Sequence, residues 1–140
     1  MPSIDSIETG ADLPERKHRP DNVDLFLYNA VLWNAHRIHY DEPYATRVEG
    51  YPGLVVQGPL LGDWMSQAVT EWLGEDGVLV EFEYSNRQAA YLGETLRTGG
   101  QVTSVDLERG EATLELFVRN EAGDIVAPGT ARVRFGGASS

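Results

Sequence analysis

Apolar residues follow a helical spacing in one stretch of the chain, Gly58–Leu73. They recur every three or four residues, which places them on one face of a helix. Pro59 occupies the first-turn position that proline favours, and Gly74 follows the last apolar residue. We therefore predict that this segment forms the longest helix and buries a broad apolar face. The residues of that face are Leu60, Leu61, Trp64, Met65, Ala68, Val69 and Trp72.

Four later segments read as strands, and their alternation of apolar and polar residues is typical of half-buried strands. It is clearest at Ala112, Leu114, Leu116 and Val118. Glycine-containing turns of hairpin length separate the last three segments, so these strands should be antiparallel neighbours. One long apolar helix before an antiparallel sheet predicts an α+β domain whose sheet wraps the helix. The predicted strands are Val78–Tyr84 and residues 95–106, 112–120 and 125–135.

The two ends of the chain lack such a pattern. Residues 1–22 are polar and contain Pro14 and Pro20, so we expect a flexible N-terminal arm with little regular structure. Small polar residues at 136–140 predict a frayed tail. The length of 140 residues suits one domain, which we place at residues 23–135.

Two segments lie between the arm and the predicted helix. Residues 23–33 are dense in apolar side chains and fit either a short helix with Asp21 as its N-cap or an extended segment. Residues 34–53 show no period but contain two histidines, three acids and several turn residues. Such composition is typical of a long ordered loop, and loops of this kind often carry function.

The composition excludes several classes of function. A net charge of −11 makes nucleic acid an unexpected partner, because nonspecific binding to it requires clustered Lys and Arg. With no cysteine, the chain can form no disulfide, thiol nucleophile or cysteine-ligated zinc site. No apolar segment approaches the ~20 residues needed to cross a bilayer, and the first residues lack a signal-peptide pattern. We expect a soluble cytoplasmic protein without a membrane partner.

Two motifs carry the candidate chemistry. The first is NAHRIHYD at residues 34–41, followed by EPYA, and the second is YPGLVVQGPL at residues 51–60. The first resembles the active-site stretch of MaoC-like hydratases and dehydratases, with the mesaconyl-CoA hydratase branch as the nearest match. The second resembles the start of that group's central helix. The resemblance covers about residues 23–135 and implies a hot dog fold, in which a curved antiparallel sheet wraps the central helix.

The resemblance also implies an activity and its partners. It implies a hydro-lyase that adds water to a 2-enoyl thioester or removes it from a 3-hydroxyacyl thioester, without a cofactor. We expect a coenzyme A thioester, because an acyl carrier protein is usually acidic and docks poorly on a strongly negative chain. We also expect a homodimer, a larger homo-oligomer, or a heteromer with another hot dog chain, since one small sheet leaves an exposed edge.

Four residues are candidates for catalysis. His39 matches the family's catalytic histidine, and an unperturbed pKa of about 6.5 lets it accept and return a proton. Asn34 stands where the wider family has aspartate, and its amide can orient water or substrate but cannot act as a base. His36, with Asp41 as the alternative, is the candidate for a second proton-transfer group or for holding the His39 tautomer. Gly58 matches the family glycine whose N–H contacts the thioester carbonyl, at a helix N-terminus suited to an enolate oxygen.

Further residues of the two motifs are candidates for binding the substrate. Arg37 can hold phosphates, although an isolated arginine is equally often part of a surface ion pair. The two histidines share an HxxH spacing, but a catalytic zinc normally needs three protein ligands, so we expect no metal. The substrate-binding candidates are Arg37, Tyr40, Asp41, Val56 and Gln57.

Two other functions remain open from the sequence. A noncatalytic hot dog subunit that supports or binds a partner hydratase chain would explain the departure at Asn34. A hot dog thioesterase would need Asp41 or Glu49 as its nucleophile or base.

Overall fold

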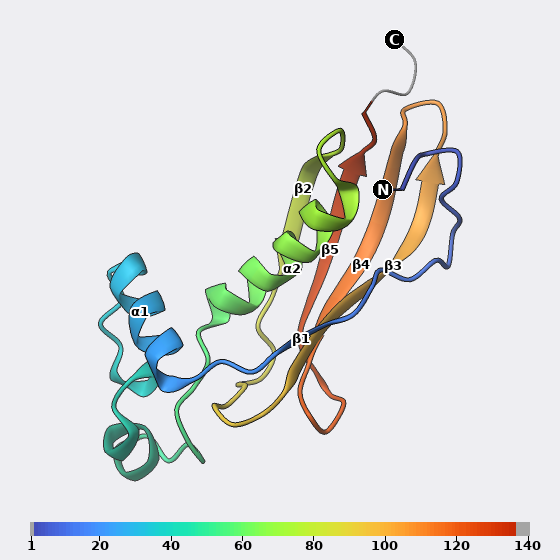
Figure 1. Ribbon diagram of the computed structural model, residues 1–140. Helices are drawn as coiled ribbons and strands as arrows, with labels where there is room; N and C mark the ends of the chain where they lie inside the picture. The colour runs from blue at the N-terminus through green and yellow to red at the C-terminus, as the bar shows by residue number, and fades with distance from the viewer. Residues whose placement is uncertain (1, 137–140) are drawn as a thin grey trace.

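The computed structural model describes residues 2–136 and contains two α-helices, two short helical turns and five strands. Figure 1 colours the chain from blue at the N-terminus to red at the C-terminus and labels the α-helices and strands. The elements are β1 (Arg16–His18), α1 (Asn22–Leu32), η1 (Arg37–His39), η2 (Tyr44–Val48), α2 (Gly58–Leu73), β2 (Val78–Tyr84), β3 (Leu96–Asp106), β4 (Glu111–Arg119) and β5 (Ile125–Arg134).

The five strands form one antiparallel sheet in the order β1-β3-β4-β5-β2. The pairs β3–β4 and β4–β5 are consecutive neighbours, which confirms the prediction for the last three strands. Strand β2 pairs with β5 at one edge, and β1 pairs with β3 at the other. Within residues 2–136, the outer side of β2 has no partner strand.

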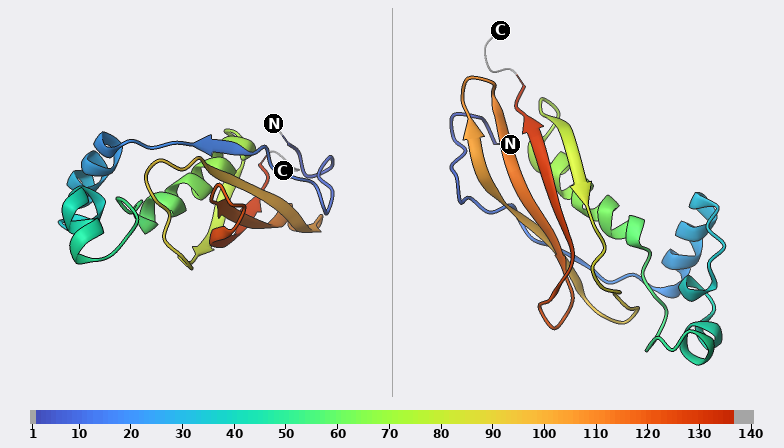
Figure 2. Two further views of the ribbon diagram at one scale, coloured as in Figure 1. Left: turned by 90° about the horizontal axis from the view of Figure 1, so that it is seen from below. Right: turned by 180° about the vertical axis from the view of Figure 1, so that it is seen from behind.

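Helix α2 lies along one face of this sheet, and the sheet curves around it (Figure 2). The helix matches the predicted bounds, and its buried residues follow the helical spacing. On β4, the alternating residues Ala112, Leu114, Leu116 and Val118 are buried and belong to the same core as α2. Helix and sheet approach closely at Gly129, where an added Cβ would lie 3.1 Å from the Met65 sulfur. The predicted α+β arrangement is thus confirmed.

The N-terminal segment packs on the sheet, where the sequence pattern predicts an arm without regular structure. Strand β1 pairs with β3, and the side chains of Ile4 and Leu13 are buried in the core. The His18 ring stacks on Trp64 of α2, with ring centroids 4.1 Å apart. These apolar residues are too widely spaced to show a period, so only the fold reveals that they are buried. Of the predicted tail, residues 137–140 lie outside the described residues.

Residues 21–53 project from the sheet and α2 as a separate lobe, visible beside them in Figures 1 and 2. The sequence left residues 23–33 open between helix and strand, and they belong to helix α1. Its N-cap is Asp21, which forms a capping box with Asp24. The helix ends at Trp33, which has a left-handed backbone (φ 56°).

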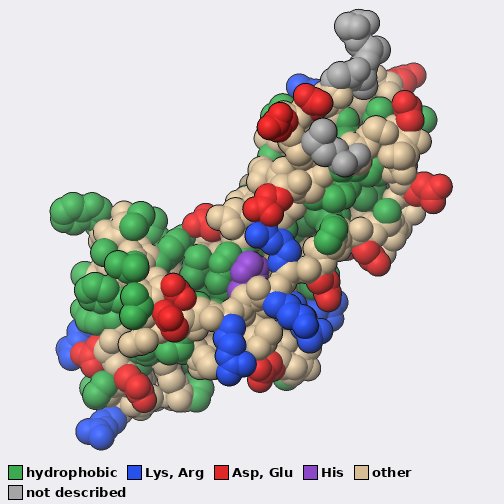
Figure 3. All heavy atoms as spheres, viewed as in Figure 1, with side chains coloured by type: hydrophobic (Ala, Val, Ile, Leu, Met, Phe, Trp, Pro, Cys, Tyr) green, Lys and Arg blue, Asp and Glu red, His purple; other side chains and the backbone are tan. Residues whose placement is uncertain are grey.

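Helix α1 is apolar on almost all sides, and much of this surface is exposed. Its buried residues are Leu25 and Asn29, whereas the Trp33 side chain at its end is 95% exposed. Figure 3 shows hydrophobic side chains gathered on the part of the molecule that α1 occupies. None of the helices in the described part of the chain is long and apolar enough to cross a membrane. The exposed apolar residues of this surface are Val23, Phe26, Leu27, Val31, Leu32 and Trp33.

Candidate active site

The fold brings the two sequence motifs together at the junction between the lobe and α2. The backbone N–H of Val55, in the second motif, donates to the carbonyl of Ile38 in the first (3.0 Å). On the other side, Val56 N–H donates to the Ala90 carbonyl (2.8 Å). The segment that leads into α2 therefore lies between the η1 turn and the segment that follows β2.

His39 is held in one tautomer by the second motif. Its ring is buried, and Nδ1 lies 2.6 Å from the Val55 carbonyl oxygen. A carbonyl can only accept, so Nδ1 carries the hydrogen and Nε2 keeps its lone pair. Burial lowers the pKa of His39, and the nearby His36 ring lowers it further, whereas the bond to Val55 opposes both. His39 is therefore a neutral ring near pH 7, and Nε2 is a proton acceptor without a partner among residues 2–136.

Neither side chain predicted to hold this tautomer does so. The exposed His36 ring lies edge-on to His39, with centroids 5.8 Å apart, and its Nδ1 accepts from Ile38 N–H. Asp41 is bound by Arg37 instead, with an N–O distance of 2.7 Å. A backbone carbonyl orients His39, which corrects that part of the prediction. Residues 37 and 41 are four positions apart on a helical turn, so the Asp41 carboxylate pairs with Arg37 and not with His39.

Asp41 and Arg37 form an ion pair with each other. The hydrogen bond from Arg37 lowers the pKa of the Asp41 carboxyl, with a further contribution from Tyr44 N–H. The Arg37 guanidinium also lies over the Tyr44 ring, 4.2 Å from its centroid. Both side chains are near the motif histidines, but the pair already neutralises its own charge. Substrate binding by Arg37 and Asp41 remains a prediction.

Asn34 closes the turn that leads to His36. Its side-chain Oδ1 accepts from the His36 backbone N–H (3.0 Å), and its own N–H donates to the Asn29 carbonyl (2.9 Å). The side chain is half-buried. This geometry anchors Asn34 between α1 and η1, five residues before His39.

The N-terminus of α2 presents an open donor at Gly58. Among residues 2–136 no acceptor receives the Gly58 N–H, and Pro59 has no N–H at all. Gln57 stands at the N-cap but makes no capping bond, because its side chain turns to α1. There Nε2 donates to the Leu25 carbonyl (2.7 Å) and to Asn29 Oδ1 (2.8 Å). The partial positive charge of the helix N-terminus is thus free to meet a developing negative charge.

The remaining predicted binding residues differ in exposure. Gln57 is fully buried and ties α1 to α2, and Val56 is buried in the core. Tyr40 is 42% exposed and meets Phe26 of α1 edge to face. Contact of these residues with a substrate stays a prediction.

One neighbour of Gly58 lies outside both motifs. A Cβ added at Gly58 would overlap the Asn86 carboxamide nitrogen and lie 2.9 Å from its Cγ. Asn86 follows β2, 28 positions after Gly58, so only the tertiary structure brings it here.

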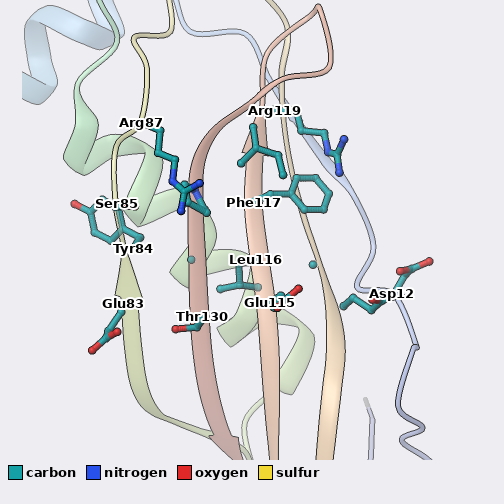
Figure 4. Close-up of a pocket in the computed structure, with 15 residues that line it drawn as sticks. Asp12, Glu83, Tyr84, Ser85, Arg87, Glu115, Leu116, Phe117, Arg119 and Thr130 are labelled. Carbon is teal, nitrogen blue, oxygen red and sulfur yellow. The ribbon is translucent and has the colours of Figure 1, made fainter.

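The outer face of the sheet, opposite α2, carries a hollow of about 660 Å³ (Figure 4). Its lining includes Arg87, Phe117 and Arg119, with the Arg119 guanidinium over the Phe117 ring. None of the four candidate catalytic residues lines it. Among the described residues, the candidate chemistry therefore lies at the lobe and the start of α2, apart from this hollow.

Comparison with known proteins identifies the family. A family model described as hydroxyacyl-thioester dehydratase type 2 matches residues 5–92, more than half of the chain. The chain belongs to this family. Mesaconyl-C(4)-CoA hydratase of Chloroflexus aurantiacus is 64% identical over 42 residues, or 30% of this chain. The matched stretch spans 15% of that relative's own length. The resemblance to MaoC-like hydratases predicted from the two motifs is confirmed.

Solved structures with the same architecture confirm the hot dog fold. The (R)-hydratase from A. caviae involved in PHA biosynthesis superposes with a TM-score of 0.84 at 19% identity, covering 93% of this chain and 98% of that one. The ChsH1-ChsH2 complex from Mycobacterium tuberculosis superposes with a TM-score of 0.80 at 22% identity, covering 91% and 98%. At these identities the likeness establishes the fold of this chain alone.

Proposed function

We propose that the chain is a hydro-lyase that adds water to a 2-enoyl thioester and removes it from a 3-hydroxyacyl thioester. The observation that carries this proposal is the buried His39, whose Nδ1–H is committed to the Val55 carbonyl while Nε2 remains a base. This base lies in the segment joined to the start of α2, where Gly58 offers an unpaired donor. A proton acceptor beside an oxyanion-stabilising helix N-terminus is the pair of groups that thioester hydration requires.

In the hydration direction, His39 Nε2 takes a proton from a water molecule while the water oxygen bonds to C3 of the enoyl group. The electrons of the C2–C3 double bond move toward the thioester carbonyl, and the resulting enolate oxygen accepts a hydrogen bond from Gly58 N–H. The enolate then takes the proton from Nε2 at C2, which restores the carbonyl and the neutral imidazole. Dehydration follows the same steps in reverse. Asn34 orients the water, since an amide can hold it but cannot deprotonate it.

The proposed substrate is a coenzyme A thioester. The relative matched at 64% identity is named as a hydratase of a CoA thioester. The net charge of −11 also disfavours docking of an acidic carrier protein.

We further propose that the chain works as a dimer, of two identical copies or of this chain with another hot dog chain. Two features support this assembly. Strand β2 leaves its main-chain hydrogen-bonding groups free along one sheet edge within residues 2–136, and α1 exposes a band of apolar side chains. Sedimentation at micromolar concentration should give a particle of at least twice 15.4 kDa. A 15.4 kDa particle would refute the homodimer and leave only the pairing with another hot dog chain.

The decisive experiment compares wild type with His39→Ala on a panel of 2-enoyl-CoA thioesters, followed by loss of the absorbance of the conjugated double bond. We expect turnover by the wild type and a loss of ~100- to 10,000-fold in kcat for the variant, the usual contribution of a general acid or base. Thermal unfolding shows whether the variant is folded. His36→Ala, measured beside it, decides whether the exposed neighbour is the second proton-transfer group.

Each alternative predicts a different result in the same assay. A wild type that turns over no thioester would support the noncatalytic subunit. Release of free coenzyme A, detected with a thiol reagent, would support a thioesterase. Because the chain has no cysteine, every thiol signal in that assay comes from the substrate.

A further inference from the structure

The Asn86 side chain lies against the first residue of α2. An added Cβ at Gly58 would overlap the Asn86 carboxamide, so the amide is in contact with the Gly58 Cα. The Asn86 side chain is exposed, and it reaches the open end of the helix from the segment after β2. Two kinds of N–H donor, one from the backbone and one from a side chain, thus meet at this point.

The backbone around Asn86 is pinned on both sides. Ser85 N–H donates to the Pro128 carbonyl (3.1 Å), and Arg87 N–H donates to the Val126 carbonyl (2.9 Å). These bonds continue the β2–β5 pairing beyond the end of β2. Ser85 and Arg87 line the hollow on the outer face of the sheet (Figure 4), whereas the residue between them reaches Gly58 on the α2 side. The alternation of an extended strand therefore directs Asn86 to the helix N-terminus.

We infer that the Asn86 carboxamide donates a second hydrogen bond to the thioester carbonyl oxygen, beside the Gly58 N–H. This inference rests on the proposed function and extends it to a residue outside both motifs. As the enolate forms, negative charge grows on that oxygen, and a preorganised donor stabilises it more than it stabilises the ground-state carbonyl. The pinned backbone supplies the preorganisation, because little reorganisation is needed when the charge appears.

The same contact gives the absence of a side chain at position 58 a consequence for Asn86. A side chain there would displace the Asn86 amide before it met any substrate. Gly58 has an ordinary negative φ, so no backbone strain requires glycine at this position. A substitution at position 58 would therefore act by moving the exposed Asn86 carboxamide.

The test compares Asn86→Ala and Asn86→Asp with the wild type in hydration of crotonyl-CoA. Asn86→Asp keeps the shape but removes the donor. We expect both variants to lose about 100- to 1,000-fold in kcat, the usual cost of one oxyanion donor, with KM changed only a few-fold. The matched control is Gln88→Ala, which removes another exposed amide from the same pinned segment. It should keep wild-type kcat and KM.

A second readout does not depend on turnover. In the His39→Ala background, bound cinnamoyl-CoA remains unreacted, and hydrogen bonding to its carbonyl shifts its absorbance to longer wavelength. We expect this shift to shrink when Asn86→Ala is added and to persist with Gln88→Ala.

The outcomes separate failure of the inference from failure of the proposed function. A wild type that hydrates crotonyl-CoA beside an Asn86→Ala variant within a few-fold of it overturns the inference and leaves the function intact. A wild type without turnover refutes the function. In that case a spectral shift that depends on Asn86 still supports the hydrogen bond from Asn86 to the thioester carbonyl. A shift independent of Asn86, or no shift, overturns the inference.

Discussion

The sheet with α2 and the projecting lobe differ in how many apolar side chains they bury. In the sheet and helix, the core is a continuous set of buried apolar side chains such as Leu114 and Met65. The lobe contributes few side chains to this core, Leu25 and Ala45 among them, and polar contacts add to its attachment. Tyr28 of α1 donates to Asp63 of α2, Gln57 donates to Asn29, and His39 donates to the Val55 carbonyl.

This difference places the candidate chemistry at a polar junction. Hydrogen bonds fix direction more strictly than apolar contacts do, so a catalytic ring gains orientation from them. The bond to Asp63 and burial both raise the pKa of the Tyr28 hydroxyl, with burial as the larger cause, so this donor stays protonated across the physiological range. The apolar core supplies most of the stability, and the polar junction orients the candidate catalytic side chains.

The largest expected effect on stability lies in the core. Leu114→Ala should lower the free energy of unfolding by about 2–5 kcal/mol, because it removes apolar contacts and leaves a cavity. Val31→Ala truncates a lobe side chain that is 76% exposed, and it should change the free energy of unfolding by no more than about 0.5 kcal/mol. Denaturant unfolding measures both. If Val31→Ala cost as much as Leu114→Ala, the lobe would be packed in solution and the contrast between the regions would be lost.

A smaller and local effect is expected from Gln57→Ala. The change leaves Asn29 Oδ1 without its buried donor, at about 1–3 kcal/mol, whereas the Leu25 carbonyl loses only a donor additional to its bond within α1. Hydrogen exchange should accelerate at α1 amides and remain unchanged in β4. The control is Gln67→Ala, which truncates an exposed amide on α2. Equal acceleration in α1 and β4 would mean that the lobe and the sheet unfold as one unit.

The smallest expected effect is a change in pH dependence. Burial, with the Arg16 charge as the second cause, lowers the pKa of His18, and burial likewise lowers that of His39. The unfolded chain therefore binds more protons than the folded one as pH falls through about 6.5, so stability is present above that pH and declines below it.

His18→Phe keeps an aromatic ring against Trp64 but cannot titrate, so it should remove the share of this loss that comes from the sheet and α2. Denaturant midpoints at about pH 7.5 and pH 5.5 measure the loss. The variant should lose less stability between them than the wild type. An equal loss would assign the acid sensitivity to the lobe and His39.

Local sequence was sufficient where one element buries one face. The bounds of α2 and β2 could be predicted to the residue because apolar spacing reports the face that packs. The same reasoning could not decide α1, since its apolar side chains surround the helix and much of that surface is exposed. It also missed β1, whose three residues gain their strand geometry from the edge of β3.

The candidate site divides in the same way. His39, Asn34 and Gly58 became candidates because the two sequence motifs resemble those of MaoC-like hydratases, and a proton-transfer ring, an amide and a helix-initiating glycine have chemistry that suits such a site. Tertiary structure alone decided that the Val55 carbonyl sets the His39 tautomer and that Asn86 reaches Gly58. Each of these contacts joins segments far apart in the chain. The partner of His39 is a backbone carbonyl, and the partner of Gly58 is a side chain outside both motifs. A sequence records which groups a chain has, whereas the distances between them exist only after the strands pair and α2 packs.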